Sequence, residues 1–334
     1  MMRIKKWSRY SFLFICVSVI ISFTAASAFA EPIKLNYVSF VAMASKFHFQ
    51  KFKEGFIDKV NEKAKGELEI VVRGGPETVK PYDLGMSVQR GVIDMANVPT
   101  SFFETLVPGA DATKISDYSA TEEREISAYQ MIADMYKEAG LHYLGRGEAT
   151  DSGFFFLFVN KPIEKKEDFK GLKLGGSTAF HGFYKNLGAS VSTVPLPEYH
   201  SALERGIVDG IVTSLSVGLQ FGLHEVSKYI VSPGMYRSNV VSVMNLKKWE
   251  SLPENLKKLI TDCMVEYEKS FMVFERGFRN QGLETAAKSG VNVIKLQGDM
   301  ADWYVQLAEK SAWDDEMARF SKERIQKIKS KLTK

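Results

Sequence analysis

The chain has 334 residues, of which 44 are Lys or Arg and 40 are Asp or Glu, so its formal net charge at pH 7 is +4. That excess lies entirely in residues 1–30, which contain four basic residues and no acidic one. The rest of the chain is formally neutral and lacks the basic field that nucleic-acid-binding proteins need. Its length is typical of two domains. Since Cys263 is the only cysteine after residue 30, we expect no disulfide within that part.

Residues 1–30 have the pattern of a cleavable signal peptide. Four basic residues precede an apolar run from Phe12 to Phe23, and small residues follow, ending in Ala28-Phe29-Ala30. The apolar run is about a dozen residues long, whereas a helix needs about 20 residues to cross a bilayer. We therefore favour cleavage before Glu31, and export to the periplasm, over the alternative of an uncleaved signal anchor.

The first elements after this segment predict an α/β fold. Residues 34–38 have the pattern of a strand, and apolar side chains then recur every four residues over 52–64, as in an amphipathic helix. Residues 68–72 predict a second strand, which ends at the turn Arg73-Gly74-Gly75-Pro76. A strand, a helix and a strand in this order favour an α/β domain.

A short junction occurs twice in the sequence, as Arg90-Gly91-Val92-Ile93-Asp94 and as Arg205-Gly206-Ile207-Val208-Asp209. Each follows a helical pattern; the glycine suits a helix end, and the β-branched run after it suits a buried strand. Both strands run into hydroxyl-rich turns, at 99–101 and 213–214. Because ligands bind beyond the carboxyl ends of strands in open α/β sheets, each half is expected to present one binding face. Chance recurrence of Gly and Asp is the alternative.

The remaining segments continue the alternation of helices and strands. Residues 122–139 predict a helix, and 141–145 and 154–159 predict strands. The second of these strands is apolar throughout, as a strand covered on both faces would be. A long helix is predicted from Pro253 to about Lys288, with Gly290 after its end, and the tail from 303 to 334 is helical in pattern.

The sequence contains no recognisable enzyme or metal motif. It has no phosphate-binding loop, no His-Glu-x-x-His, no Gly-x-Ser-x-Gly and no Cys-x-x-Cys. Its five histidines are scattered singly, without metal-ligand spacing on a helix. We therefore predict no catalytic residue, no metal and no cofactor. A nucleophile at Ser177 with a distant histidine is the one enzymatic alternative.

Several segments together resemble one family of transport proteins. The central segment carries Lys-Gly-Leu-Lys-Leu at 170–174, Val-Pro-Leu-Pro-Glu-Tyr at 194–199 and Ala-Leu-Glu-Arg-Gly-Ile-Val-Asp-Gly at 202–210. It resembles the signature of the solute-binding subunits of tripartite ATP-independent periplasmic (TRAP) transporters, the dicarboxylate-binding-protein-like family. Gly74-Gly75-Pro76-Glu77 and the first junction resemble the family's first lobe, and Leu252-Pro253-Glu254 resembles its third segment. The resemblance covers most of the chain after the signal peptide.

The resemblance implies an α/β, two-lobed periplasmic-binding-protein (Venus flytrap) fold. Each lobe would be a mixed β-sheet flanked by helices, with a long helix shared by both. We expect lobe I at 31–152 plus about 240–281, and lobe II at 153–239 plus about 282–334.

The same resemblance implies a function in transport. The lobes would close by hinge motion over a small-molecule ligand and deliver it to integral-membrane TRAP subunits, with uptake driven by an ion gradient. We expect a monomer that is not an enzyme. The alternative is a periplasmic ligand sensor or scaffold that addresses a membrane receptor.

The sequence departs from the family at its ligand clamp. In the family an arginine usually follows the Gly-Leu-Lys-Ile motif and pairs with the ligand carboxylate, but here that position is Gly175. A second basic position falls near Phe155. Arg73, Arg146 or Arg237 could reach the cleft from another direction. We therefore hypothesise a ligand that is less anionic or more apolar than the family norm.

The predicted ligand-binding residues combine an apolar lining with hydrogen-bonding points, although core positions are the alternative for the aromatic ones. They are Phe40, Glu77, Thr100, Phe103, Phe155, Gly175, Gly176, Ser177, Thr213 and Tyr236.

Overall fold

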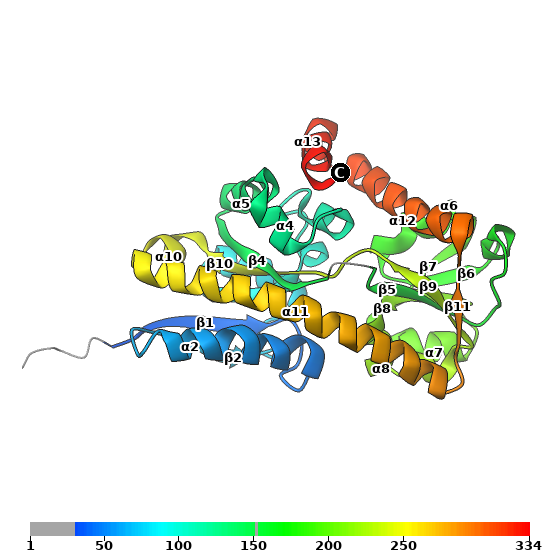
Figure 1. Ribbon diagram of the computed structural model, residues 1–334, viewed down its shortest axis with the longest axis horizontal. Helices are drawn as coiled ribbons and strands as arrows, with labels where there is room; N and C mark the ends of the chain where they lie inside the picture. Colours follow the sequence, from blue (N-terminus) through cyan, green and yellow to red (C-terminus); the bar gives the residue numbers. More distant parts are fainter. Residues whose placement is uncertain (1–30, 151–152) are drawn as a thin grey trace, which may run out of the picture.

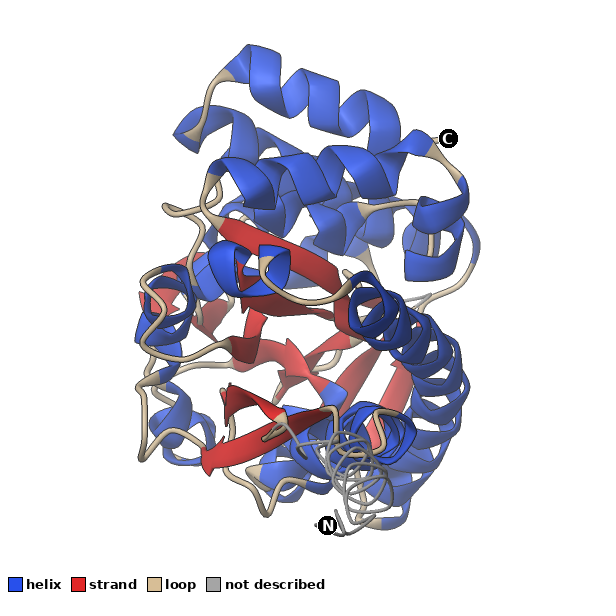
Figure 2. Cartoon of the chain, turned by 90° about the vertical axis from the view of Figure 1, so that its left-hand side faces the viewer, coloured by secondary structure: helices blue, strands red, loops and turns tan. Residues whose placement is uncertain are grey.

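The computed structural model describes residues 31–150 and 153–334, so the predicted signal peptide lies outside the described residues. The chain forms two sheets of five and six strands, set side by side and bridged by one long helix (Figure 1). Turned by 90°, the molecule shows its strands in the interior with helices packed around them (Figure 2). The predicted two-lobed α/β fold is confirmed.

The first sheet has the order β2-β1-β3-β10-β4. Strands β1 to β3 are parallel, and β10 is antiparallel to both of its neighbours. The strands are β1 (Ile33–Ser39), β2 (Leu68–Gly74), β3 (Met95–Pro99), β4 (Leu141–Ala149) and β10 (Asn239–Asn245). The strand between β3 and β4, β10, therefore comes from a part of the chain that follows five of the six strands of the second sheet.

The second sheet has the order β11-β9-β5-β8-β6-β7. Its strands are β5 (Phe155–Val159), β6 (Lys173–Gly176), β7 (Ser190–Thr193), β8 (Gly210–Ser214), β9 (Tyr229–Met235) and β11 (Asn292–Lys295). The central strand β5 is almost wholly buried, which confirms the expectation for its apolar sequence.

Short helices cover both sheets. Around the first lie two π-helical turns (Lys46–Gln50 and Lys53–Ile57) leading into α2 (Asp58–Lys63), then α3 (Leu84–Gln89), the 3-10 segment Ala110–Ile115, α4 (Ala120–Glu125), α5 (Ser127–Glu138) and α10 (Leu246–Glu250). Around the second lie α6 (His181–Asn186), α7 (Tyr199–Glu204), α8 (Leu215–Gln220) and α9 (Leu223–Val226).

The helix α11 (Glu254–Lys288) spans both lobes, as its predicted length indicates. Its first half buries Ile260, Met264 and Tyr267 in the core of the first lobe. Its second half packs on α8, where Gly282 leaves room for Leu215 and Leu219. One continuous helix therefore connects two separate cores (Figure 1).

A second connection between the lobes is made by the last two helices. The helix α12 (Gly298–Arg319) packs on α6 and β9 of the second lobe and reaches the 3-10 segment of the first. The helix α13 (Lys322–Leu332) then packs on α5 and on the same segment. Residues 322–332 thus lie on the first lobe, whereas the sequence assigned the whole tail to the second. The other lobe boundaries stay a prediction.

The repeated junction is a true structural equivalence. Asp94 accepts a hydrogen bond from Asn36 N at 2.7 Å, and Asp209 accepts one from Lys173 N at 2.8 Å, so each carboxylate ties its strand to the parallel neighbour. The strands begin only after these aspartates. Val92 and Ile207, expected in buried strands, are 71 % and 60 % exposed.

Candidate ligand-binding site between the lobes

The lobes meet at the carboxyl ends of their parallel strands. His48, which follows β1, contacts Ser216, which follows β8: His48 Nε2 lies 3.4 Å from Ser216 Oγ. Tyr82 of the first lobe is also close enough to Tyr199 of the second to act electrostatically on its phenol. The carboxyl ends of β1 and β8 are therefore brought to one boundary.

Three side chains form a buried hydrogen-bonded series across this boundary, here called the interlobe polar chain: Glu148, His48 and Ser216. His48 Nδ1 contacts Glu148 Oε2, and His48 Nε2 faces Ser216. Ser45 caps the turn that carries His48, since its Oγ accepts the His48 N–H at 3.4 Å. His48, Glu148 and Ser216 are 6 %, 0 % and 5 % exposed. Sequence reasoning missed this arrangement, because its members are about 100 and 168 positions apart.

A row of small polar side chains lies behind the interlobe polar chain. Ser39, Asn97 and Ser242 are paired across β1, β3 and β10, and all three are buried. Ser242 Oγ donates to Asn97 Oδ1 at 2.7 Å, while Asn97 Nδ2 has no partner among the described residues. The row faces α11, because Met95 and Met244, two residues away on the same strands, pack in the core beneath that helix.

The predicted residues of the first lobe have different surroundings. Phe40 is half-buried, with its ring 5.3 Å from that of His48, so it lies beside the interlobe polar chain. Glu77 is exposed and accepts the Gly75 N–H at 2.7 Å, which lowers the pKa of its carboxyl. Thr100 is fully buried and donates to Asp111 Oδ1, and Phe103 packs against Tyr136 in the core. Thr100 and Phe103 are therefore structural in this conformation.

The predicted residues of the second lobe lie mostly at strand ends. Phe155 is half-buried beside Phe180, with ring centroids 5.5 Å apart. Ser177 is exposed and caps the turn after β6 by accepting the Ala179 N–H. Thr213 is 6 % exposed and pairs with Phe156.

The two predicted glycines are constrained by their neighbours. A Cβ atom at Gly175 would lie 2.6 Å from Val208 Cγ1 and 2.9 Å from Val194 Cγ2. Gly176 has a φ of +122°, which disfavours any other residue, and a Cβ there would lie 3.2 Å from Tyr199 Oη. Neither position has room for a family-type arginine in this backbone.

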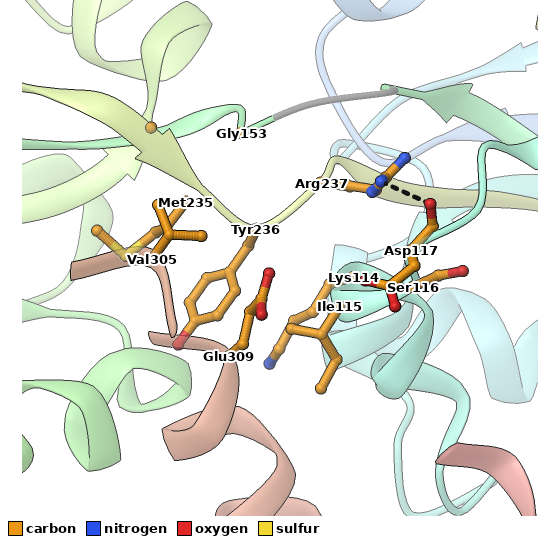
Figure 3. Close-up of a pocket in the computed structure, with 11 residues that line it drawn as sticks. Lys114, Ile115, Ser116, Asp117, Gly153, Met235, Tyr236, Arg237, Val305 and Glu309 are labelled. Atoms are coloured by element: carbon orange, nitrogen blue, oxygen red, sulfur yellow. Dashed lines mark hydrogen bonds between the residues drawn. The ribbon is translucent and has the colours of Figure 1, made fainter. Parts of the chain in front are cut away.

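Tyr236 belongs to a pocket at the hinge. The pocket has a volume of about 100 Å³ and is lined by the 3-10 segment of the first lobe, the crossing strands and α12 (Figure 3). Tyr236 is buried there, stacks on Phe180 and donates to Ala308 O at 2.8 Å. Arg237 turns into the same pocket and donates to Asp117 O at 3.1 Å. Both side chains thus lie where the chain crosses between the lobes.

The two other candidate arginines are also engaged. Arg146 is fully buried, lies 3.2 Å from the Glu123 carboxylate and donates to the carbonyls of Thr113 and Tyr118. Arg73 donates to Asn36 Oδ1 at 2.7 Å. Arg146 is thus committed to contacts inside the protein, whereas Arg73 is exposed and makes its contact with Asn36 through Nε.

Exposed apolar side chains flank the boundary, and no sequence motif indicates them. Tyr82 is 69 % exposed and stacks on Phe102, with ring centroids 4.2 Å apart. Met43 and Leu196 are 45 % and 41 % exposed. They lie on the loops that follow β1 and β7.

One acidic cluster has the ligand types of a cation site. Carboxylate oxygens of Glu104, Asp111 and Glu316 lie within 4.8 Å of one another. However, Lys114 pairs with Asp111, and Arg319 pairs with Glu104 and Glu316. Side-chain cations already neutralise most of this charge, so the cluster does not call for a metal ion.

Comparison with known proteins decides the family. The family model for bacterial extracellular solute-binding proteins, family 7, matches residues 38–318. The chain belongs to this family. It is 24 % identical over 316 residues to a solute-binding protein of Albidiferax ferrireducens, covering 87 % of this chain and 90 % of that one. It is also 24 % identical over 321 residues to the C4-dicarboxylate-binding periplasmic protein of Rhodobacter capsulatus, covering 90 % and 89 %.

A solved structure shows the same fold as this family 7 protein. It is a TRAP periplasmic solute-binding protein from Desulfovibrio salexigens with bound orotic acid, at a TM-score of 0.73 and 22 % identity, covering 90 % of this chain and 98 % of that one. The resemblance inferred from the motifs at 170–210 is thus confirmed, and the protein is a solute-binding receptor by family. Among residues 31–150 and 153–334, no helix is both long and apolar enough to cross a membrane.

Proposed function

We propose that this chain captures a small molecule between its lobes in the periplasm and delivers it to the integral-membrane subunits of a TRAP transporter, without chemistry on the ligand. Its family membership and its relatives support this role. The observation that carries the proposal is the contact of His48 with Ser216, because it places the carboxyl ends of β1 and β8 against each other across a hinge.

The ligand is held without the usual arginine clamp. Val208 and Val194 fill the space beside Gly175, Arg146 is buried against Glu123, and Arg237 donates to Asp117 O. Phe40, Tyr82 and Phe155 supply half-buried or exposed rings near the boundary. Such a lining favours a ligand with an apolar body and few anionic groups. Phe40, Glu77, Phe155, Ser177 and Thr213 remain proposed contacts.

Export follows from the same proposal. We propose that residues 1–30 are a signal peptide that is removed before Glu31, and that the remaining chain acts as a monomer. Amino-terminal sequencing of the chain recovered from the periplasm tests this; a first residue other than Glu31 contradicts the predicted site.

The test of transport compares a strain that lacks this protein with its parent. The ligand is first identified by denaturing the purified periplasmic chain and analysing the released small molecule by mass spectrometry. Loss of uptake of that compound in the deletion strain, restored by the gene, is the expected result. Unchanged uptake together with a lost transcriptional response to the compound contradicts the proposal and identifies a sensor.

A further inference from the structure

Glu148 is a buried carboxylate that is only half satisfied. One of its oxygens, Oε2, contacts His48 Nδ1. The other, Oε1, is buried and accepts no hydrogen bond from any described residue. A buried acceptor without a donor is costly, and the cost rises when the acceptor is charged. Glu148 Oε1 therefore has an unused capacity to accept a hydrogen bond.

The nearby cations cannot satisfy it, because each is matched to another carboxylate. Arg146, two residues earlier on β4, pairs with Glu123 at 3.2 Å. Arg124 makes two hydrogen bonds to Glu268, of 2.6 and 3.0 Å. Glu148 thus differs from both buried glutamates: its carboxylate contacts an imidazole, His48, and no guanidinium among the described residues. The phenols of Tyr37 and Tyr267 also lie within electrostatic range of it.

Glu148 lies close to the boundary between the lobes, where the ligand is proposed to bind. Glu148 is near the end of β4, just before the chain crosses to the second lobe. His48 carries the contact onward to Ser216, which belongs to that other lobe. The half-buried ring of Phe40 lies edge-on to the imidazole, so the pair is next to one of the proposed ligand contacts.

We propose that Glu148, positioned by His48, accepts hydrogen bonds from an N–H-bearing group of the ligand, such as an ammonium, an amidinium or an amide. The interlobe polar chain would then bind a hydrogen-bond donor of the ligand. The arginine clamp of the family instead binds a ligand carboxylate, which is a hydrogen-bond acceptor. Charge-assisted hydrogen bonds to a desolvated carboxylate are about twice as strong as neutral ones, so one such contact can select the ligand class. This inference rests on the proposed function and specifies its ligand.

The test is a thermal-shift screen of residues 31–334 with three panels of small molecules. The panels are amines and amidines, amides, and carboxylates that lack any N–H, each with aliphatic and aromatic members; benzylamine, benzamide and benzoate form one matched set. We expect the largest stabilisation in the first two panels. Titration calorimetry of the best compound should then show at least a tenfold weaker affinity in Glu148→Gln than in the unmodified chain.

Matched variants separate binding from folding. Glu69→Gln removes an exposed carboxylate from the same sheet and should leave the affinity unchanged. If Glu148→Gln does not fold, Glu148→Asp keeps the charge but withdraws the oxygen from the ligand, and it should lose affinity as well.

The outcomes distinguish the inference from the proposed function. Largest shifts from carboxylates without N–H, or equal affinity in the unmodified chain and the Glu148 variants, overturn the inference and leave solute binding intact. No shift from any panel counts against the capture of a small solute itself.

Discussion

Val208 occupies the space into which a side chain at Gly175 would extend: its Cγ1 atom lies 2.6 Å from the position of a Cβ on that glycine. The packing around Gly175 therefore leaves no room for the arginine of the family motif. Val194 is a second obstacle, since its Cγ2 atom lies 2.9 Å from the same Cβ position. A single reverse substitution cannot restore the clamp.

Gly175→Ala should destabilise the protein by about 1–3 kcal/mol, because the added methyl group overpacks the contact with Val208. Gly277→Ala is the matched control: Gly277 lies in α11 with nothing within 4 Å of an added Cβ. The control should gain about 1 kcal/mol from better helix propensity. Urea denaturation of both variants measures the difference. Equal stability of Gly175→Ala and the unmodified chain would show that the valines move aside freely.

Arg146 should matter for stability and not for ligand choice. Replacing it by Met leaves the fully buried Glu123 without its cation, at a cost of about 3–5 kcal/mol. The double variant Arg146→Met/Glu123→Leu should recover part of that loss, since it removes both charges. Arg205→Met, at an exposed position, is the control. Thermal denaturation measures the stabilities; a folded Arg146→Met chain with altered ligand preference contradicts the structural role.

Glu316 should make stability depend on pH near neutrality. Burial raises the pKa of its carboxyl from about 4.5 to about 7, so between these values the folded chain holds a proton that the unfolded chain has released. The free energy of unfolding should therefore fall as pH rises from about 4.5 to about 7, by an amount on the order of 3 kcal/mol.

Glu316→Gln should remove that slope, which urea titrations at several pH values between 4.5 and 8 would measure. Asp314→Asn, on the same helix but half exposed, serves as the comparison. A slope as steep in Glu316→Gln as in the unmodified chain would assign the pH dependence to other groups.

Tyr82 should contribute to binding much more than to folding. Because its ring is 69 % exposed, Tyr82→Ser should cost no more than about 1 kcal/mol, the loss of its stack on Phe102. If the closed lobes cover the ring against the ligand, affinity should fall about tenfold. Val92→Ser, at an equally exposed apolar residue on the far end of the first lobe, should leave affinity unchanged. Calorimetric titration compares the two; equal effects would remove Tyr82 from the binding face.

The local sequence pattern was enough to predict the helices, the strands and the family, but not the arrangement of side chains between the lobes. The apolar run at 154–159 and the repeat around Asp94 and Asp209 specify strands through short-range periodicity and turn chemistry, and both appear in the fold. The exposure of Val92 was mispredicted, because a β-branched residue just after a helix end can lie in the turn rather than the strand. His48, Glu148 and Ser216 could not be grouped, since only the crossing of the lobes brings them together.

The place of β10 between β3 and β4 has a consequence for how the protein is made. Residues 239–245 are needed to join the strands of the first lobe, yet they are synthesised after most of the second lobe. A growing chain shorter than this cannot complete its first sheet, however early the other four strands emerge. The first sheet can therefore reach its final strand order only after residues 239–245 have left the ribosome.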